Sequence, residues 1–151
     1  MSEKKSILFV CLGNICRSPT CEGICRLVGK GEVIVESAST SSYHRNECPD
    51  ERSQDICLKH GIDISGHRAR PLRSDDWTRF DVIAALDDNV FQFLQGAKPA
   101  DARAKLVLFN APHGIADPYY GGRSGFKKMF TQIYNIMWKF LVDHELIQGD
   151  E

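Results

Sequence analysis

The chain has 151 residues, 42% of them hydrophobic, and a net charge of −1 from 19 basic and 20 acidic side chains. This length predicts a single domain, residues 1–151, with a full hydrophobic core. The balanced charge argues against a nucleic-acid partner, and no apolar run is long enough for a membrane span.

The first predicted strand leads into a tight loop and then into a helix. Residues 7–10 are apolar and typical of a strand, and residues 11–17 (CLGNICR) interrupt that pattern. Ser18 and Pro19 then open a helix, because Ser is a favoured helix cap and Pro is favoured in the first turn.

The composition of this loop predicts an anion-binding site. Gly13 and Asn14 are the residue types that best tolerate a positive φ, and a loop bent in that way turns its N–H groups inward. The helix N-terminus adds free N–H groups, and Arg17 adds a planar fork of donors that matches two phosphate oxygens. The same groups would stabilise a thiolate at Cys11, which predicts nucleophilic attack on phosphorus.

Two other interpretations of the cysteines are weaker. Cys11 could be a buried strand cysteine, but that leaves the Gly-Asn turn and Arg17 without a role. Cys16, Cys21 and Cys25 are close enough in sequence to be metal ligands. However, Cys21 and Cys25 share one face of the predicted helix and are explained more simply as core. We therefore predict no metal and no cofactor.

The string from Val10 to Pro19, VCLGNICRSP, resembles the signature of the low-molecular-weight protein tyrosine phosphatase family. The resemblance covers nearly the whole chain, and it implies that Cys11 is the nucleophile and Arg17 the phosphate clamp. It also implies a hydrogen bond from Ser18 to the thiolate and favours a reversible disulfide between Cys11 and Cys16. The phosphate-binding residues that it implies are Leu12, Gly13, Asn14, Ile15, Cys16 and Ser18.

The rest of the chain alternates between helices and strands. We predict helices at residues 19–28, 49–60, 87–94 and 125–147, and strands at 32–36, 80–86 and 105–109. Residues 37–46 and 61–73 are predicted to be polar connections. This alternation predicts an α/β fold, a parallel four-stranded sheet with helices on both faces. Ligands of such sheets bind beyond the carboxyl ends of the strands, where the Cys11 loop lies.

A second motif lies in the Gly- and Pro-rich stretch 110–123. Asp117-Pro118-Tyr119-Tyr120 resembles the family's general-acid motif, although Asp-Pro alone could simply start a turn. A tyrosyl oxygen, with a pKa of ~10, needs a proton in order to leave, and a carboxylic acid on a loop is the usual donor. We therefore expect Asp117 to protonate the leaving group and then to activate water.

Other matches to the family concern loop support and the rim of the site. Ser37 and His67 match positions that brace the loop through Asn14 in the family, and Ala38 replaces a family Gly. A deep cleft would admit an aryl phosphate and leave a phosphoserine out of reach. The candidate rim residues are Leu12, Tyr43, Tyr119 and Tyr120.

The sequence thus predicts a cytoplasmic, monomeric protein tyrosine phosphatase with acid phosphatase activity that acts through a phosphocysteine. Its expected partners are phosphotyrosine-containing proteins as substrates, and phosphate or vanadate as inhibitors. The cytoplasmic expectation rests on six cysteines without an export signal.

Three alternative functions are less consistent with the residues. An arsenate reductase on this scaffold needs a downstream cysteine pair, and residues 58–151 contain no Cys. A protein arginine phosphatase has Thr in the loop where this chain has Ile15. A non-catalytic phosphoprotein-binding module would lose Cys11 or Asp117, and both are present.

Overall fold

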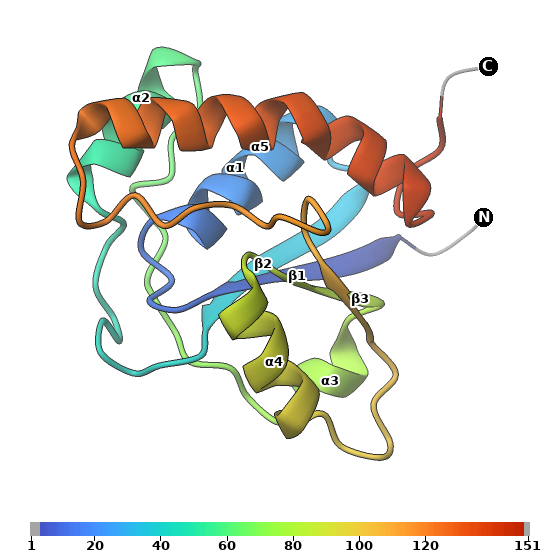
Figure 1. Ribbon diagram of the computed structural model, residues 1–151. Coiled ribbons are helices and arrows are strands. Elements are labelled where there is room, and N and C mark those ends of the chain that lie inside the picture. The colour runs from blue at the N-terminus through green and yellow to red at the C-terminus, as the bar shows by residue number, and fades with distance from the viewer. Residues whose placement is uncertain (1–3, 150–151) are drawn as a thin grey trace.

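A parallel sheet runs through the centre of the computed structural model, which describes residues 4–149 (Figure 1). The strands β1 (Lys5–Cys11), β2 (Val33–Ser39), β3 (Val82–Ala85) and β4 (Lys105–Leu108) are hydrogen-bonded in the order β2-β1-β3-β4. The helices are α1 (Arg17–Gly29), α2 (Glu51–Lys59), α3 (Asp76–Arg79), α4 (Asp88–Ala97) and α5 (Arg123–Asp143). The predicted fold class, with a loop following the first strand, is confirmed.

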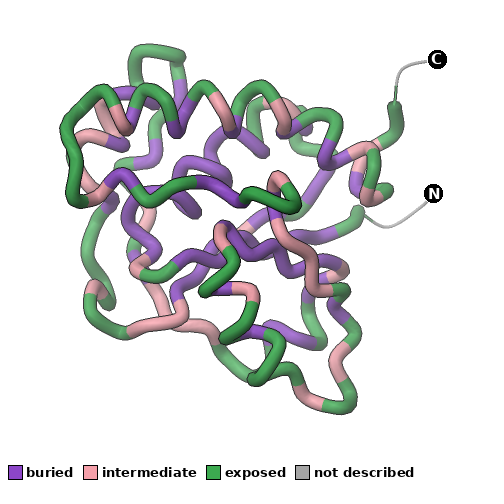
Figure 2. Tube along the Cα trace, viewed as in Figure 1, coloured by how far each residue is buried: buried purple, intermediate pink, exposed green. Residues whose placement is uncertain are grey.

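Two hydrophobic cores lie on opposite faces of the sheet. Helices α1, α2 and α5 cover one face, and α3 and α4 lie on the other (Figure 1). Along β1, Ile7 and Phe9 join the first core, and Leu8 and Val10 join the second. The strand is therefore buried on both sides (Figure 2), which explains its continuous apolar sequence.

The carboxyl ends of three strands converge on one edge of the sheet. Cys11 ends β1, Asp87 follows β3, and the segment 109–122 connects β4 to α5. This convergence is a property of parallel sheets and places polar residues from distant parts of the chain together.

Several element boundaries differ from the sequence prediction. Strand β2 continues through Ser39 rather than ending at Glu36, because Ser37 pairs with Phe9 and Ser39 with Cys11 along β1. Helix α3 was not predicted, and α5 ends at Asp143 rather than at residue 147. No helix in the described part of the chain is long and apolar enough to cross a bilayer.

We expect substitution of Phe109 to cost much of the core's stability. Its fully buried ring packs edge-on against Phe9, at a centroid distance of 5.8 Å, and lies 4.7 Å from Phe140. Phe109→Ala should lower the free energy of unfolding in urea by ~3–5 kcal/mol. Phe93→Ala, which removes a ring that is 52% exposed, should change it by about 0.5 kcal/mol. Equal losses in the two variants would contradict this description of the core.

Candidate active site

Cys11 lies at the end of β1 with its thiol held between two polar groups. The backbone N–H of Asn14 donates to Cys11 Sγ at 3.2 Å, and Ser18 Oγ lies 3.0 Å from the same sulfur. Ser18 Oγ accepts a hydrogen bond from Asn14 Nδ2 at 2.7 Å, which leaves its own proton free to point at the sulfur. Both contacts stabilise a thiolate, the nucleophilic form of cysteine.

The backbone of the loop presents its donors to one side. The carbonyls of Cys11 and Leu12 accept hydrogen bonds from the N–H groups of Thr40 and Ser41, at 3.0 and 3.2 Å. The Ile15 carbonyl likewise accepts one from Asp50 N–H at 2.8 Å. Within residues 4–149, no acceptor is found for the N–H groups of Leu12, Gly13, Ile15 and Cys16. These free donors, next to the N-terminus of α1, form an anion-binding cradle around the thiol.

Ser18 does not cap helix α1, contrary to the sequence prediction. The capping position is Cys16, which makes no side-chain capping bond, and Ser18 lies inside the first turn. Its hydroxyl is committed to Cys11 and Asn14 instead. Pro19 lies in the first turn, as predicted.

Asn14 fixes the shape of the loop. Its φ of 59° is in the left-handed region, whereas the predicted positive φ at Gly13 is not observed. Its amide is fully buried and uses every donor and acceptor position: Nδ2 donates to Ser18 Oγ and Ser37 Oγ, and Oδ1 accepts from Arg70 N–H and His67 Nε2. Because a backbone N–H can only donate, the contact with Arg70 settles the orientation of the amide.

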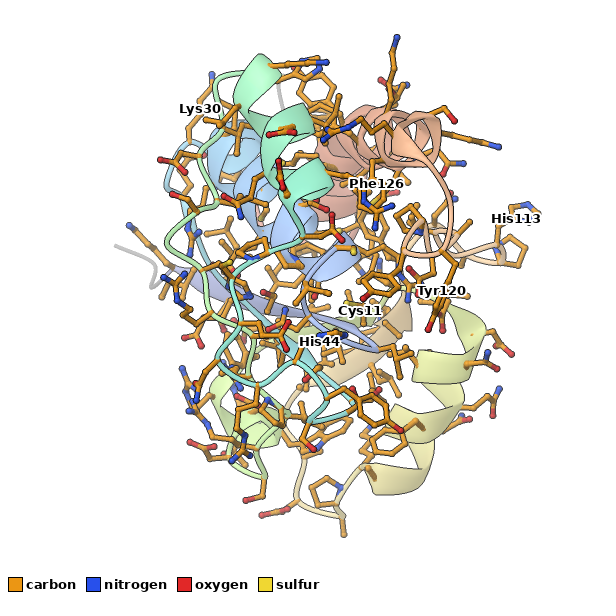
Figure 3. All side chains as sticks on the ribbon, turned by 90° about the vertical axis from the view of Figure 1, so that its left-hand side faces the viewer. Cys11, Lys30, His44, His113, Tyr120 and Phe126 are labelled. Carbon is orange, nitrogen blue, oxygen red and sulfur yellow. The ribbon has the colours of Figure 1, made fainter. Side chains whose placement is uncertain are left out.

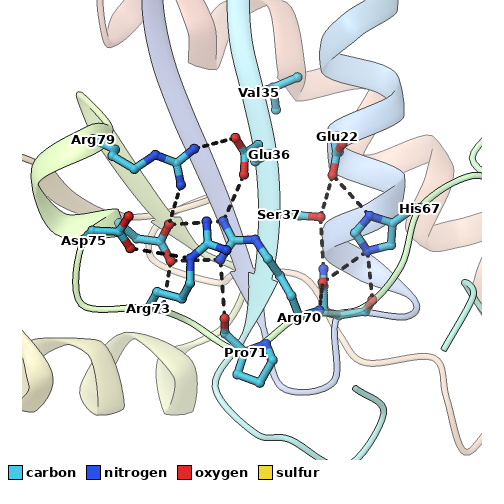
Figure 4. Close-up of polar contacts among 12 residues, drawn as sticks. Glu22, Val35, Glu36, Ser37, His67, Arg70, Pro71, Arg73, Asp75 and Arg79 are labelled. Carbon is cyan, nitrogen blue, oxygen red and sulfur yellow. Dashed lines mark hydrogen bonds and ion pairs between the residues drawn. The ribbon is translucent and has the colours of Figure 1, made fainter. Parts of the chain in front are cut away.

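The groups that brace Asn14 are themselves anchored. Ser37 Oγ donates to Glu22 Oε1 at 2.6 Å, and His67 Nδ1 lies 3.6 Å from the same carboxylate oxygen (Figure 4). Burial lowers the pKa of His67, while the Glu22 carboxylate and the hydrogen bond to Asn14 act in the opposite direction. Ser37 and His67 thus both contact Asn14, and Glu22 is an additional member of this group.

Helix α3 supports the same network from the other side. The Arg70 guanidinium forms a two-pronged contact with the fully buried carboxylate of Asp76, at 2.9 and 3.1 Å. This contact fixes the backbone at residue 70, whose N–H reaches Asn14 Oδ1 at 3.0 Å.

Arg17 is buried and held from two directions. Its Nη1 donates to Asp87 Oδ2 at 2.6 Å and to the Ile115 carbonyl at 3.0 Å, and its side chain is only 3% exposed. Asp87 also caps α4, because its Oδ1 accepts from Val90 N–H at 2.7 Å. The guanidinium therefore has little freedom to move, and it lines the same cleft as the cradle.

Asp117 lies at the edge of the cradle, next to Arg17. Its Oδ2 is 3.6 Å from Arg17 Nη2, and its Oδ1 accepts from Tyr119 N–H at 3.0 Å. The carboxyl group is about one-third exposed, so water can reach it. The structure thus brings Cys11 and Arg17, from the first loop, together with Asp117, from a distant stretch of the chain, in a single cleft.

The cleft is lined by residues of the Cys11 loop and by aromatic side chains, and Figure 3 labels Cys11 and Tyr120 among them. Its volume is about 110 Å³. The predicted rim residues Leu12, Tyr43, Tyr119 and Tyr120 all line it. Tyr43 and Tyr120 are 79% and 91% exposed, so they are available to a large substrate.

His44 also lines the cleft and was not singled out in the sequence. Its ring contacts Glu47 through Nδ1 at 3.0 Å and lies 5.9 Å from the Tyr119 ring. A Cβ at Gly13 would come within 2.9 Å of this ring, so a larger residue there would require the ring to move.

The remaining cysteines do not share the environment of Cys11. Burial raises the pKa of Cys57 to about 11 and that of Cys25 to about 12, and it raises the pKa of Cys16 still further, so these groups stay as thiols. Cys21 and Cys25 pack in the hydrophobic core, as predicted. Among residues 4–149, no group of three or more His, Cys, Asp or Glu side chains is arranged to hold a metal ion.

Comparison with known proteins assigns the family. The sequence profile of the family described as "Low molecular weight phosphotyrosine protein phosphatase" matches residues 6–149. This chain belongs to that family. The phosphatase is 36% identical to a Schizosaccharomyces pombe member, over 93% of this chain and 97% of the relative. It is 38% identical to a Gallus gallus member, over 92% of this chain and 95% of the relative. A crystal structure of a protein tyrosine phosphatase from Entamoeba histolytica superposes with a TM-score of 0.86 at 30% identity, covering 94% of this chain and 97% of that one.

We expect the Asn14 side chain to be needed for turnover by this phosphatase. Asn14→Gly keeps the positive φ but deletes the buried amide, so the loop should lose its shape and kcat/KM should fall roughly 10–100-fold. Asn46→Ala is the control for strain alone, because Asn46 also has a positive φ, of 68°, and is exposed. It should retain kcat/KM. If Asn14→Gly keeps the wild-type kcat/KM, the buried amide is not needed for turnover and Asn14 contributes only its positive φ.

Proposed function

We propose that this phosphatase hydrolyses phosphotyrosine and other aryl phosphate monoesters through a phosphocysteine at Cys11. The observation that carries the proposal is the position of Cys11 Sγ, which lies at the floor of a cradle of free N–H groups. A proton donor, Asp117, stands at the rim of the same cleft. Residues 1–151 form the single phosphatase domain in this proposal.

In the first step the Cys11 thiolate attacks phosphorus, forming the S–P bond as the bond to the aryl oxygen breaks. The leaving oxygen takes the proton of the Asp117 carboxyl group, so that a neutral phenol departs. Charge that develops on the phosphoryl oxygens is met by the free N–H groups of the loop and by the Arg17 guanidinium. These N–H groups are those of Leu12, Gly13, Ile15 and Cys16. Because Asp87 and Ile115 already orient Arg17, little reorganisation is required.

In the second step water attacks the phosphocysteine and the thiolate leaves. The Asp117 carboxylate takes a proton from the water, which restores the acid for the next cycle. The sulfur departs as a thiolate into hydrogen bonds from Ser18 Oγ and Asn14 N–H. The same contacts thus assist the thiolate as nucleophile and as leaving group.

Substrate selection follows from the depth of the cleft. The buried sulfur and the exposed rings of Tyr43 and Tyr120 favour a long, flat aryl ester over a short alkyl one. Phosphotyrosine-containing proteins are the substrates in this proposal, and phosphate and vanadate occupy the cradle as inhibitors. The cleft is complete within one chain, which supports action as a monomer, and free cysteines support a cytoplasmic location.

Cys11→Ser should abolish hydrolysis of an aryl phosphate while leaving vanadate binding largely intact, because the backbone cradle remains. Arg17→Lys should also be severely impaired, since one ammonium cannot replace a two-pronged guanidinium contact. Steady-state kinetics and calorimetric vanadate titration measure these effects. Cys48→Ser, at the exposed cysteine, is the control and should match wild type. Substantial turnover by Cys11→Ser would contradict the assignment of the nucleophile.

Asp117→Asn should lower kcat/KM for phosphotyrosine by roughly 10²–10⁴-fold, because the amide cannot donate a proton to the leaving oxygen as an acid does. The loss should be smaller for 4-nitrophenyl phosphate, whose leaving group departs with little protonation. The ratio of the two losses is the diagnostic measurement. Equal losses on both esters would point to a structural role for Asp117.

A further inference from the structure

Arg52 is not part of the cleft lining, yet it touches the segment that carries Asp117. Its Nη2 donates to the Tyr119 carbonyl at 2.9 Å, and its Nη1 donates to the Gly121 carbonyl at 2.7 Å. These two carbonyls lie two and four residues beyond Asp117, on the turn that leads into α5. One planar guanidinium thus spans the turn that holds the proposed proton donor.

The same guanidinium is anchored to helix α2. Its Nε and Nη2 donate to the Asp50 carboxylate, each at 3.0 Å, and Asp50 Oδ1 accepts the Arg52 N–H at 2.9 Å as the helix cap. Burial would raise the pKa of Asp50, but the hydrogen bonds from Arg52 outweigh it and leave that pKa below its usual value. The carboxylate therefore stays charged over the physiological pH range and keeps its ion pair with Arg52.

Asp50 joins this anchor to the phosphate cradle. Its backbone N–H donates to the Ile15 carbonyl at 2.8 Å, within the loop between Cys11 and Arg17. The chain of contacts runs from Ile15 through Asp50 and Arg52 to Tyr119, and each link is a hydrogen bond. These hydrogen bonds fix the position of the loop that carries Asp117 relative to the loop that binds phosphate.

Aromatic rings restrict Arg52 further. Its guanidinium carbon lies 4.3 Å from the centroid of the Phe126 ring and 5.9 Å from that of Tyr119. The cation and its stem are mostly covered, with the side chain 25% exposed. Such stacking favours arginine over lysine, because only a planar cation can lie on a ring and bond at its edges.

We propose that Arg52 is a positioning residue for the proton donor: it fixes the turn of residues 119–121 to the phosphate loop and so holds Asp117 at the leaving oxygen. The proposal rests on the role of Asp117 as the acid. Arg52 itself touches no reacting atom. Its loss should therefore impair protonation of the leaving group specifically, without impairing phosphate binding.

The test compares Arg52→Met with wild type, because methionine keeps an apolar stem against Phe126 and removes the four-armed contact. We expect kcat/KM to fall roughly 10–100-fold for phenyl phosphate and much less for 4-nitrophenyl phosphate, with vanadate affinity unchanged. Arg52→Lys should recover little, since an ammonium cannot span the two carbonyls and the carboxylate. Arg123→Met is the matched control, an exposed arginine with an ion pair to Asp55 at 2.7 Å, and should behave as wild type.

A double-mutant cycle isolates the link to Asp117. If Arg52 acts through the acid, Arg52→Met should change kcat/KM by less than about twofold in the Asp117→Asn background. Full additivity, or equal losses on both esters, would overturn the role of Arg52 while leaving Asp117 as the acid. If Asp117→Asn itself shows equal losses on both esters, the acid assignment fails and this proposal fails with it.

Discussion

The buried amide of Asn14 is the interaction on which the site depends. Burying a polar group costs folding free energy unless each of its donors and acceptors forms a hydrogen bond. The Asn14 amide forms four such bonds, to partners on β2, on α1 and in the segment 67–70. Because these partners come from different elements, the amide acts as the common anchor of the first loop. Its left-handed backbone then aims its own N–H at the Cys11 sulfur.

Charge in the cleft is arranged around one buried guanidinium. Arg17 stands between the carboxylates of Asp87 and Asp117, at 2.6 and 3.6 Å. The first contact is short and orients the side chain, whereas the second is longer. In the mechanism that we propose, this longer contact leaves Asp117 free to turn to the leaving group. A phosphate dianion that enters the cradle meets the remaining face of Arg17 and the free N–H groups. The same cation therefore serves a fixed structural partner and a transient chemical one.

The sequence predicts those parts of the fold and of the site that depend on residues close together in the chain. The loop from Cys11 to Arg17, the order of strands and helices, and the Asp117 motif could all be predicted, because each depends on residues close together in the chain. The partners Glu22, Asp87 and Arg52 could not, since their contacts span 15 to 70 positions and depend on the packed sheet. Asp87 alone carried a signal, as an acidic residue directly after a buried strand. For Ser18, the contact with Cys11 that the family resemblance implies is present, whereas the helix-capping role expected from its residue type is not.

The most direct test of the account is to trap the covalent intermediate. Asp117→Asn should react with 4-nitrophenyl phosphate, because its leaving group needs little protonation. The variant should then hydrolyse the phosphocysteine slowly, because the general base is missing. Denaturing quench followed by peptide mass mapping should then find one phosphoryl group on Cys11. A phosphoryl group on any other residue, or continued turnover with no covalent phosphoenzyme, would contradict nucleophilic attack by Cys11.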